Sequence, residues 1–287
     1  MKSTLNIRGQ LFSLERPVVM GILNATPDSF YADSRTETER DIAQRATQIV
    51  EEGGSFIDVG AFSTRPGALE VAEEEECRRL QQALRIVRRE VPDAIISVDT
   101  FRPSIARRSV EEWGADIIND VSEDGLTGIV GTPIHEQERM SDVVAQLHVP
   151  YILMSVQPDI RQMLMNFSRK VADLHAAGVS DIILDPGFGF GKTLDENYEI
   201  LGQLEILHTL GCPLLVGMSR KSMVSKVLGI TADEALNGTT VVHTLALQAG
   251  ADILRVHDVR AACEAVALVE KTKAAMNNHN PIHTHAI

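Results

Sequence analysis

The sequence predicts a single-domain α/β protein folded as a (β/α)8 TIM barrel. Two observations lead to this prediction: eight short apolar runs recur along the chain, and helical patterns separate them. Eight such units in roughly 260 residues match the usual size of such a barrel. A doubly wound open sheet shows the same alternation and is the competing arrangement.

The eight apolar runs are the expected strands. They are rich in Val, Ile and Leu and nearly continuous, which is typical of strands buried on both faces of a parallel sheet. In order they are Val18–Leu23, Phe56–Val59, Ala94–Val98, Ile117–Ile118, Tyr151–Met154, Ile182–Leu184, Leu214–Val216 and Ile253–Val256.

Apolar residues at helical spacing predict the helices between the strands, and glycines stand where several should end. The stretch Asp124–Glu138 holds Gly and Pro and is expected to be a loop after the fourth strand. We expect residues 277–287, with three histidines, to be a disordered tail. The expected helices are Thr38–Glu52, Glu73–Glu90, Asp195–Leu210, Asp233–Ala249 and Arg260–Ala275.

The composition excludes several classes of protein. The 287 residues carry a net charge of −13, which argues against a partner such as nucleic acid or an anionic membrane surface. The three cysteines, Cys77, Cys212 and Cys263, are far apart and fit neither a disulfide framework nor a zinc site. The start of the chain does not resemble a signal peptide, and no apolar run approaches roughly 20 residues, so we expect a cytoplasmic protein.

Polar residues follow most of the expected strands. In a barrel these side chains project from the carboxyl-terminal mouth, where active sites lie. Six such strand ends are more than caps alone require. They hold Asn24, Asp99, Asn119 and Asp120, Asp185, the run Ser219–Lys221, and Arg255 with His257.

The charges at these ends fall into two groups. Arg220, Lys221, Arg255 and His257 follow the last two strands, the usual phosphate region of a barrel. The alternative for these four residues is a salt-bridge network. Arg255 lies inside an apolar run and needs a buried partner, for which an anionic ligand is a natural candidate.

Asp99, Asn119 and Asp185 form the second group and could pair with the N–H and NH2 groups of a planar heterocycle. The alternative for Asp185 is a helix cap or turn before Pro186. Asp185–Lys192 also holds a GxGxG pattern, but it matches neither common nucleotide motif.

Seven segments together resemble the dihydropteroate synthase family. Any one of them is a weak signal, but their order along almost the whole chain is specific. The segments are Gly21–Phe30, Ser63–Gly67, Ser97–Thr100, Ile118–Asp120, Asp185–Lys192, Gly217–Ser222 and Arg255–Asp258.

The resemblance implies an enzyme that joins 6-hydroxymethyl-7,8-dihydropterin diphosphate to p-aminobenzoate and releases diphosphate. It also implies Mg²⁺ as cofactor, with Asn24 as a metal ligand, and a homodimer. The pterin site would comprise Asp99, Asn119, Asp185 and Lys221, and the diphosphate site Asn24, Arg255 and His257. The catalytic set would be Asp99, Lys221, Arg255 and His257, and the p-aminobenzoate site Thr64, Arg65, Pro66, Phe190, Lys221 and Ser222.

Two positions depart from the family pattern. The fifth strand usually ends in Met-His-Met, whereas this chain has Ser155 in place of the histidine. Phe62 stands where the family often has Glu. The missing histidine makes a non-catalytic pterin-binding homologue one rival interpretation. A methyltetrahydrofolate-binding methyltransferase domain is the other, because it shares the barrel and the pterin contacts, but it needs neither the diphosphate site nor the segment Ser63–Gly67.

Overall fold

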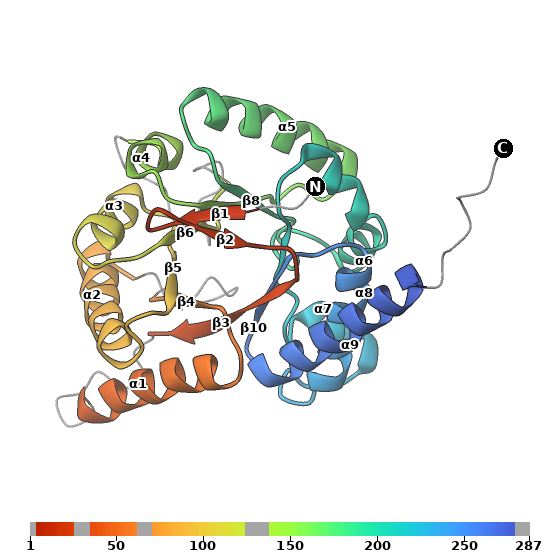
Figure 1. Cartoon of the computed structure of the whole chain (residues 1–287), viewed down its shortest axis with the longest axis horizontal. Coiled ribbons are helices and arrows are strands. Elements are labelled where there is room, and N and C mark those ends of the chain that lie inside the picture. The colour runs from red at the N-terminus through yellow and green to blue at the C-terminus, as the bar shows by residue number, and fades with distance from the viewer. Residues whose placement is uncertain (1–3, 26–34, 62–70, 124–137, 279–287) are drawn as a thin grey trace.

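The computed structural model describes residues 4–25, 35–61, 71–123 and 138–278. In these ranges one sheet has eight parallel strands in the order β8-β7-β6-β5-β4-β3-β10-β9. A parallel bridge between Leu184 and Leu214 joins the two ends of that order, so the sheet closes on itself inside a ring of helices (Figure 1). The prediction of a (β/α)8 barrel is confirmed, and the open-sheet alternative is wrong.

Each predicted strand is present within two residues of its expected limits. Most run one or two residues further than predicted, because the polar residue after the apolar run still pairs with the neighbouring strand. The strands are β3 (Val18–Asn24), β4 (Phe56–Gly60), β5 (Ile95–Asp99), β6 (Ile117–Asp120), β7 (Tyr151–Met154), β8 (Ile182–Asp185), β9 (Leu215–Val216) and β10 (Ile253–Val256).

The helices differ more from the prediction. The expected helix Asp195–Leu210 is divided into α6 (Leu194–Gly202) and a 3-10 helix (Leu204–Leu210). The last helix reaches Asn278, two residues into the expected tail, and residues 279–287 lie outside the described part. The other helices are α1 (Arg35–Glu51), α2 (Glu73–Glu90), α3 (Pro103–Glu111), α4 (Met140–Leu147), α5 (Ile160–Ala176), α7 (Ser222–Leu228), α8 (Leu236–Gln248) and α9 (Val259–Asn278).

Four of these helices, α3, α4, α5 and α7, were not predicted. The sequence does carry a signal for α5, because the carboxylate of Asp159 accepts hydrogen bonds from the backbone N–H groups of Arg161 and Gln162. Of the expected loop Asp124–Glu138, only Glu138 lies among the described residues.

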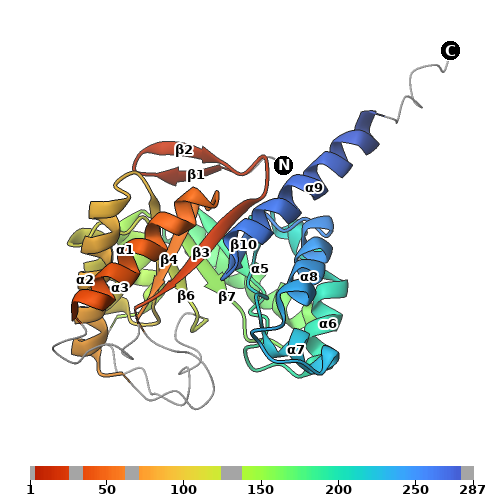
Figure 2. The same ribbon diagram turned by 90° about the horizontal axis from the view of Figure 1, so that it is seen from below.

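An unpredicted hairpin crosses one end of the barrel (Figures 1 and 2). Its strands, β1 (Thr4–Ile7) and β2 (Gln10–Ser13), are antiparallel and joined by Arg8 and Gly9. Both turn residues have positive φ, as a two-residue hairpin turn of the primed kind requires. Alternate residues Leu5 and Ile7 are buried against the barrel.

The hairpin covers an apolar layer inside the barrel. Leu5, Ile7 and Leu14 pack on side chains near the start of each strand, among them Met20, Phe56, Ile117, Ile152, Ile183, Leu215 and Ile253. Side chains on a strand repeat their direction every two residues, so Asp58, Asn119, Asp185 and Arg255 stand in the next layer above four of these positions.

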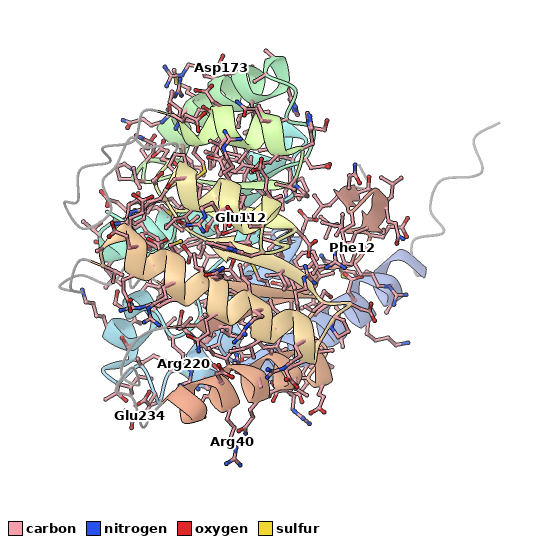
Figure 3. The ribbon with its side chains drawn as sticks, turned by 90° about the vertical axis from the view of Figure 1, so that its left-hand side faces the viewer. Phe12, Arg40, Glu112, Asp173, Arg220 and Glu234 are labelled. Atoms are coloured by element: carbon pink, nitrogen blue, oxygen red, sulfur yellow. The ribbon has the colours of Figure 1, made fainter. Side chains whose placement is uncertain are left out.

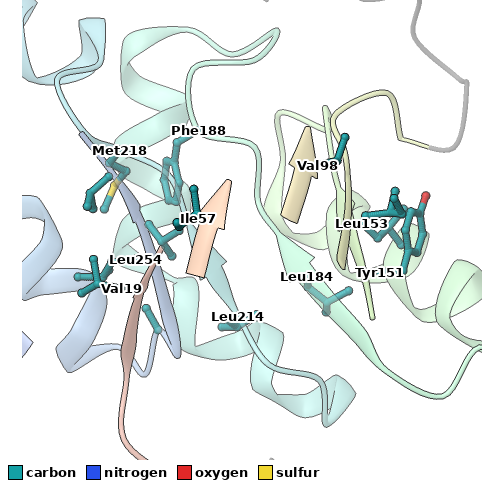
Figure 4. Packing of buried hydrophobic residues seen from close by; sticks show 14 of the residues in the cluster. Val19, Ile57, Val98, Tyr151, Leu153, Leu184, Phe188, Leu214, Met218 and Leu254 are labelled. Atoms are coloured by element: carbon teal, nitrogen blue, oxygen red, sulfur yellow. The ribbon is translucent and has the colours of Figure 1, made fainter. Parts of the chain in front are cut away.

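The outward-facing residues of the strands form a second apolar core against the helices. Figure 4 shows part of it, including Ile57, Val98, Leu153 and Leu254, all of which are buried. Because the same strands carry polar side chains inward near the mouth, the fold has a dry outer core and a polar inner face at one end.

We expect Leu5→Ala to lower the free energy of unfolding by about 2–5 kcal/mol, because it opens a cavity at the closed end of the barrel. Ligand binding at the opposite mouth should be unchanged. Leu11→Ala is the matched control, since Leu11 lies in the same hairpin but is 77% exposed, and it should change stability by less than about 0.5 kcal/mol. Chemical denaturation measures both, and equal losses would contradict the hairpin's role.

Candidate active site

Arg255 is the centre of the polar layer at the mouth. Its Nε donates to Oδ2 of Asp58 over 2.6 Å, and its Nη2 donates to Oδ2 of Asp99 over 2.7 Å. Burial opposes the charge of this guanidinium, but the two carboxylates outweigh it and raise the pKa of Arg255. Arg255 therefore has carboxylate partners, as the salt-bridge alternative expects. It also stands at the mouth, as an anion ligand would.

Asp99 shares this ion pair from the end of β5. Burial raises the pKa of Asp99 to about 7, against the lowering effect of Arg255, and the negative charge of Asp58 adds to the rise. A buried carboxyl group whose pKa lies near neutrality and that has a specific charged partner is typical of a functional site.

Asn119 and Asp185 line the same inner face. Nδ2 of Asn119 donates to Oδ2 of Asp58 over 3.1 Å. One oxygen of Asp185 accepts a hydrogen bond from the backbone N–H of Gly187 at 2.8 Å, so the turn-forming role considered for Asp185 is real. Burial also raises the pKa of Asp185, while Lys221 opposes the shift, so the turn does not remove this carboxyl from the interior.

Lys221 faces the loop that follows β8. Its Nζ donates to the carbonyl oxygen of Phe188 and lies 4.6 Å from the centre of the Phe190 ring, a cation–π contact. Burial lowers the pKa of Lys221 to about 8, although Asp185 opposes the shift. Phe190 and Lys221 are thus adjacent, and Ser222 begins α7 at an exposed position beside them.

Lys192 holds that loop in place, a role the sequence did not predict. Its Nζ donates to the carbonyl oxygens of Ser155, Gly187 and Phe190 at 2.9, 3.0 and 3.2 Å. Gly187 has φ +66° and lies so close to the Ser155 carbonyl that a Cβ would clash. The Ser155 hydroxyl accepts from the backbone N–H of Gln157, so the residue that departs from the family pattern is used in its own turn.

The residues of the expected anion site differ in their surroundings. His257 is half-buried after β10, with its backbone N–H bonded to the Ser219 hydroxyl and its carbonyl bonded to Arg45. Asn24 ends β3 with an exposed side chain. Arg220 follows the salt-bridge alternative, because its guanidinium forms a two-pronged ion pair with Asp258 at 2.7 and 2.9 Å.

Figure 3 shows that Arg220 lies toward the mouth, at the opposite end from Phe12 of the hairpin. Asp120, named at the end of the fourth strand, is also structural, since it accepts from Tyr151 and Ser122. Thr64, Arg65, Pro66 and Phe62 lie outside the described residues.

Comparison with known proteins decides the family. A model of the pterin-binding enzymes matches residues 20–257. The chain belongs to the pterin-binding enzyme family. A dihydropteroate synthase of Escherichia coli K12 is 36% identical over 286 residues, covering 94% of this chain and 97% of that protein. One from Bacillus subtilis is 36% identical over 94% of this chain and 92% of its own length.

Solved structures of this family agree. The Xanthomonas albilineans dihydropteroate synthase with 4-aminobenzoic acid has a TM-score of 0.80 and 34% identity, covering 96% of this chain and 99% of that one. The resemblance drawn from the seven segments is confirmed, and the activity of these pterin-binding relatives is that of a transferase. In the described residues, no helix has the length and apolar character needed to cross a membrane.

The raised pKa of Asp99 predicts a pH dependence of stability. Between its ordinary value of 3.8 and about 7, the folded protein keeps a proton at Asp99 that the unfolded chain has lost. The contribution of this group to the free energy of unfolding is therefore fully present below pH about 4 and lost as the pH rises through about 7. Asp99→Asn should remove this decline.

Urea denaturation of both proteins at several pH values from about 4 to 8 tests this expectation. The stability of the wild type should fall relative to the variant across the window and then run parallel to it. Parallel curves throughout would show that Asp99 has an ordinary pKa.

Proposed function

We propose that the chain joins 6-hydroxymethyl-7,8-dihydropterin diphosphate to p-aminobenzoate at this mouth, forming 7,8-dihydropteroate and releasing diphosphate. One observation carries the assignment of the site. Five side chains with matching chemistry, from separate elements, converge on one end of the barrel: Asp99, Asn119, Asp185, Lys221 and Arg255.

The pterin would bind against Asp99, Asn119, Asp185 and Lys221. A dihydropterin edge carries ring N–H and NH2 donors, and the buried Asp185 carboxyl and the Asn119 carbonyl oxygen are acceptors. Lys221 supplies a donor, and its ammonium interacts electrostatically with the carboxyl group of Asp185. These roles are supported by burial and by hydrogen-bonding chemistry.

The diphosphate would bind at Arg255, His257 and Asn24. A guanidinium has five N–H donors, and the bonds of Arg255 to Asp58 and Asp99 use two of them, which leaves three for a ligand. Asn24 offers an exposed amide oxygen, a hard ligand that suits Mg²⁺, which usually takes few protein ligands and completes its shell with phosphate oxygens and water. When bound, Mg²⁺ would neutralise charge on the diphosphate.

The reaction depends more on stabilising the departing diphosphate than on a general base. The aromatic amine of p-aminobenzoate is already neutral at pH 7, so its lone pair can attack without a base and it loses one N–H proton only after the carbon–nitrogen bond has formed. The barrier therefore lies in breaking the carbon–oxygen bond to diphosphate. Arg255 and His257 would stabilise the charge that develops on the leaving oxygen. The electron-rich pterin would stabilise the methylene cation, with Asp99 assisting electrostatically, which favours an SN1-like path.

The p-aminobenzoate would lie beside Phe190, Lys221 and Ser222, with Thr64, Arg65 and Pro66 completing the site by the family resemblance. The contact between the Lys221 ammonium and the Phe190 ring places an apolar surface and a positive charge side by side. That pairing suits a ring that bears a carboxylate.

We also propose a cytoplasmic homodimer. Five large apolar side chains are exposed on the neighbouring helices α7 and α8, namely Val227, Leu228, Leu236, Val241 and Leu245. A group of this kind on adjacent helices is typical of a surface that a partner covers. The symmetric solution for identical chains is a two-fold dimer.

A diphosphate-release assay with and without p-aminobenzoate tests the reaction. We expect diphosphate and 7,8-dihydropteroate to form in equal amounts only when both substrates are present. Binding of the pterin without turnover would support the non-catalytic homologue instead. Methyl transfer from methyltetrahydrofolate, with no diphosphate release, would support the methyltransferase alternative.

Asp185→Asn should weaken pterin binding about tenfold or more, because a charged acceptor of N–H donors is lost while the backbone turn can persist. Calorimetry with 6-hydroxymethylpterin measures the change, and circular dichroism confirms the fold. An unchanged affinity in the folded variant would remove Asp185 from the pterin site.

Arg255→Ala should weaken the diphosphate-bearing substrate much more than the bare hydroxymethylpterin, since the removed charge faces the leaving group. Competition binding of the two ligands measures the difference. Equal losses for both would mean that Arg255 serves the pterin ring.

Val241→Glu should convert the dimer to monomers, because it buries a charge in the proposed interface. Light scattering after gel filtration gives the mass. Lys226→Glu, an exposed change on α7 without apolar loss, is the control. A wild type that is monomeric at all concentrations would overturn the dimer.

A further inference from the structure

Asp58 is a buried carboxylate in the barrel wall that the sequence motifs leave without a role. It is the third residue of β4, pairs in register with Ile22 and Ser97 on the neighbouring strands, and has no exposed surface. It lies in the layer directly above Phe56, so it occupies the inner face near the mouth. A charge at such a position must be compensated by close partners.

Its partners are two side chains of the candidate site. Oδ2 of Asp58 accepts from Nε of Arg255 at 2.6 Å and from Nδ2 of Asn119 at 3.1 Å. The Arg255 bond, together with the one from Nη2 to Asp99, holds the guanidinium at two of its nitrogens, each on a different carboxylate. Its plane is thereby fixed, and its remaining N–H groups point in defined directions.

The contact with Asn119 fixes which way that amide faces. A carboxylate accepts and cannot donate, so it selects the NH2 end of Asn119 and leaves the carbonyl oxygen on the other side. That oxygen is buried and has no hydrogen-bond partner among the described residues. A buried acceptor in this state calls for a donor from outside the chain's own side chains.

We propose that Asp58 is the positioning residue of the site: one carboxylate sets the plane of Arg255 and the orientation of the Asn119 amide. This inference rests on the proposed function. Asp58 acts on the pterin through Asn119 and on the leaving group through Arg255. Because Asp58 holds the NH2 group of Asn119, the site presents the Asn119 oxygen, an acceptor, instead of that donor. Together with the Asp185 carboxyl, this acceptor favours a ligand edge rich in N–H groups.

The test compares Asp58→Asn with the wild type. Calorimetry with 6-hydroxymethylpterin should show a loss of affinity of about ten- to hundredfold, because the amide no longer enforces the orientation of Asn119. In turnover, KM for the pterin diphosphate should rise and kcat should fall, while KM for p-aminobenzoate stays within about twofold, because Lys221 and Phe190 have no bond to Asp58.

A double-mutant cycle separates positioning from general damage. In an Asn119→Ala background, Asp58→Asn should lower pterin affinity by about threefold or less, because the group through which it acts is gone. Equal losses in both backgrounds would overturn the proposal. If Asp58→Asn does not fold, Asp58→Ser takes its place in the same cycle, with the same two outcomes.

Asp116→Asn is the matched control. Asp116 is another buried carboxylate, held by Arg8 and Arg88 just before β6 begins, at the end of the barrel that the hairpin covers. It should lower the melting temperature without changing pterin affinity. A pterin loss as large as that of Asp58→Asn would attribute both effects to weakened packing and refute the positioning role.

The proposed function and this inference fail separately. If the wild type binds pterin but does not release diphosphate, the proposed reaction is wrong, yet the calorimetric cycle still decides the role of Asp58. If turnover is normal and the cycle shows independent effects, only the inference is wrong.

Discussion

The buried charge of Arg255 is the constraint on which the mouth of the barrel depends. A guanidinium inside a barrel wall is tolerated only if anionic partners meet it with good geometry. Asp58 on β4 and Asp99 on β5 do so, and since β3 lies between β10 and β4 in the sheet, the arginine reaches across a strand to find them. The ion pair therefore ties together the carboxyl ends of strands that are distant in sequence and fixes the shape of the site.

The period of two along each strand then divides the barrel into an apolar end and a polar end. Phe56 and Ile253 belong to the layer under the hairpin, and Asp58 and Arg255 stand two residues later. The apolar layer excludes water from one side of the ion pair, which strengthens it and also raises the cost of leaving any member unpaired. The inside of the barrel is thus packed with apolar side chains at the hairpin end and offers polar groups for recognition at the mouth.

The barrel could be predicted because strands buried on both faces read as continuous apolar runs. The hairpin was missed because four residues with alternate exposure carry little pattern, and α3, α4 and α7 are too short to show a clear helical period. Asp58 was hidden inside an apolar run, although a lone charge there is itself a signal. The ion pair of Arg220 could not be predicted because its partner, Asp258, lies far along the chain, and such pairings follow from the fold rather than from local sequence.

Burial shifts the pKa values of the acidic and the basic groups at the mouth in opposite directions. It raises the pKa of Asp99 to about 7 and lowers that of Lys221 to about 8, so each ion is held at a cost in free energy. A ligand that brings N–H donors to the carboxyls and an anion to the cations lowers that cost on binding. The groups that weaken the folded protein are thus the groups that gain most from the ligand, which explains why a fold with so dry a core keeps them.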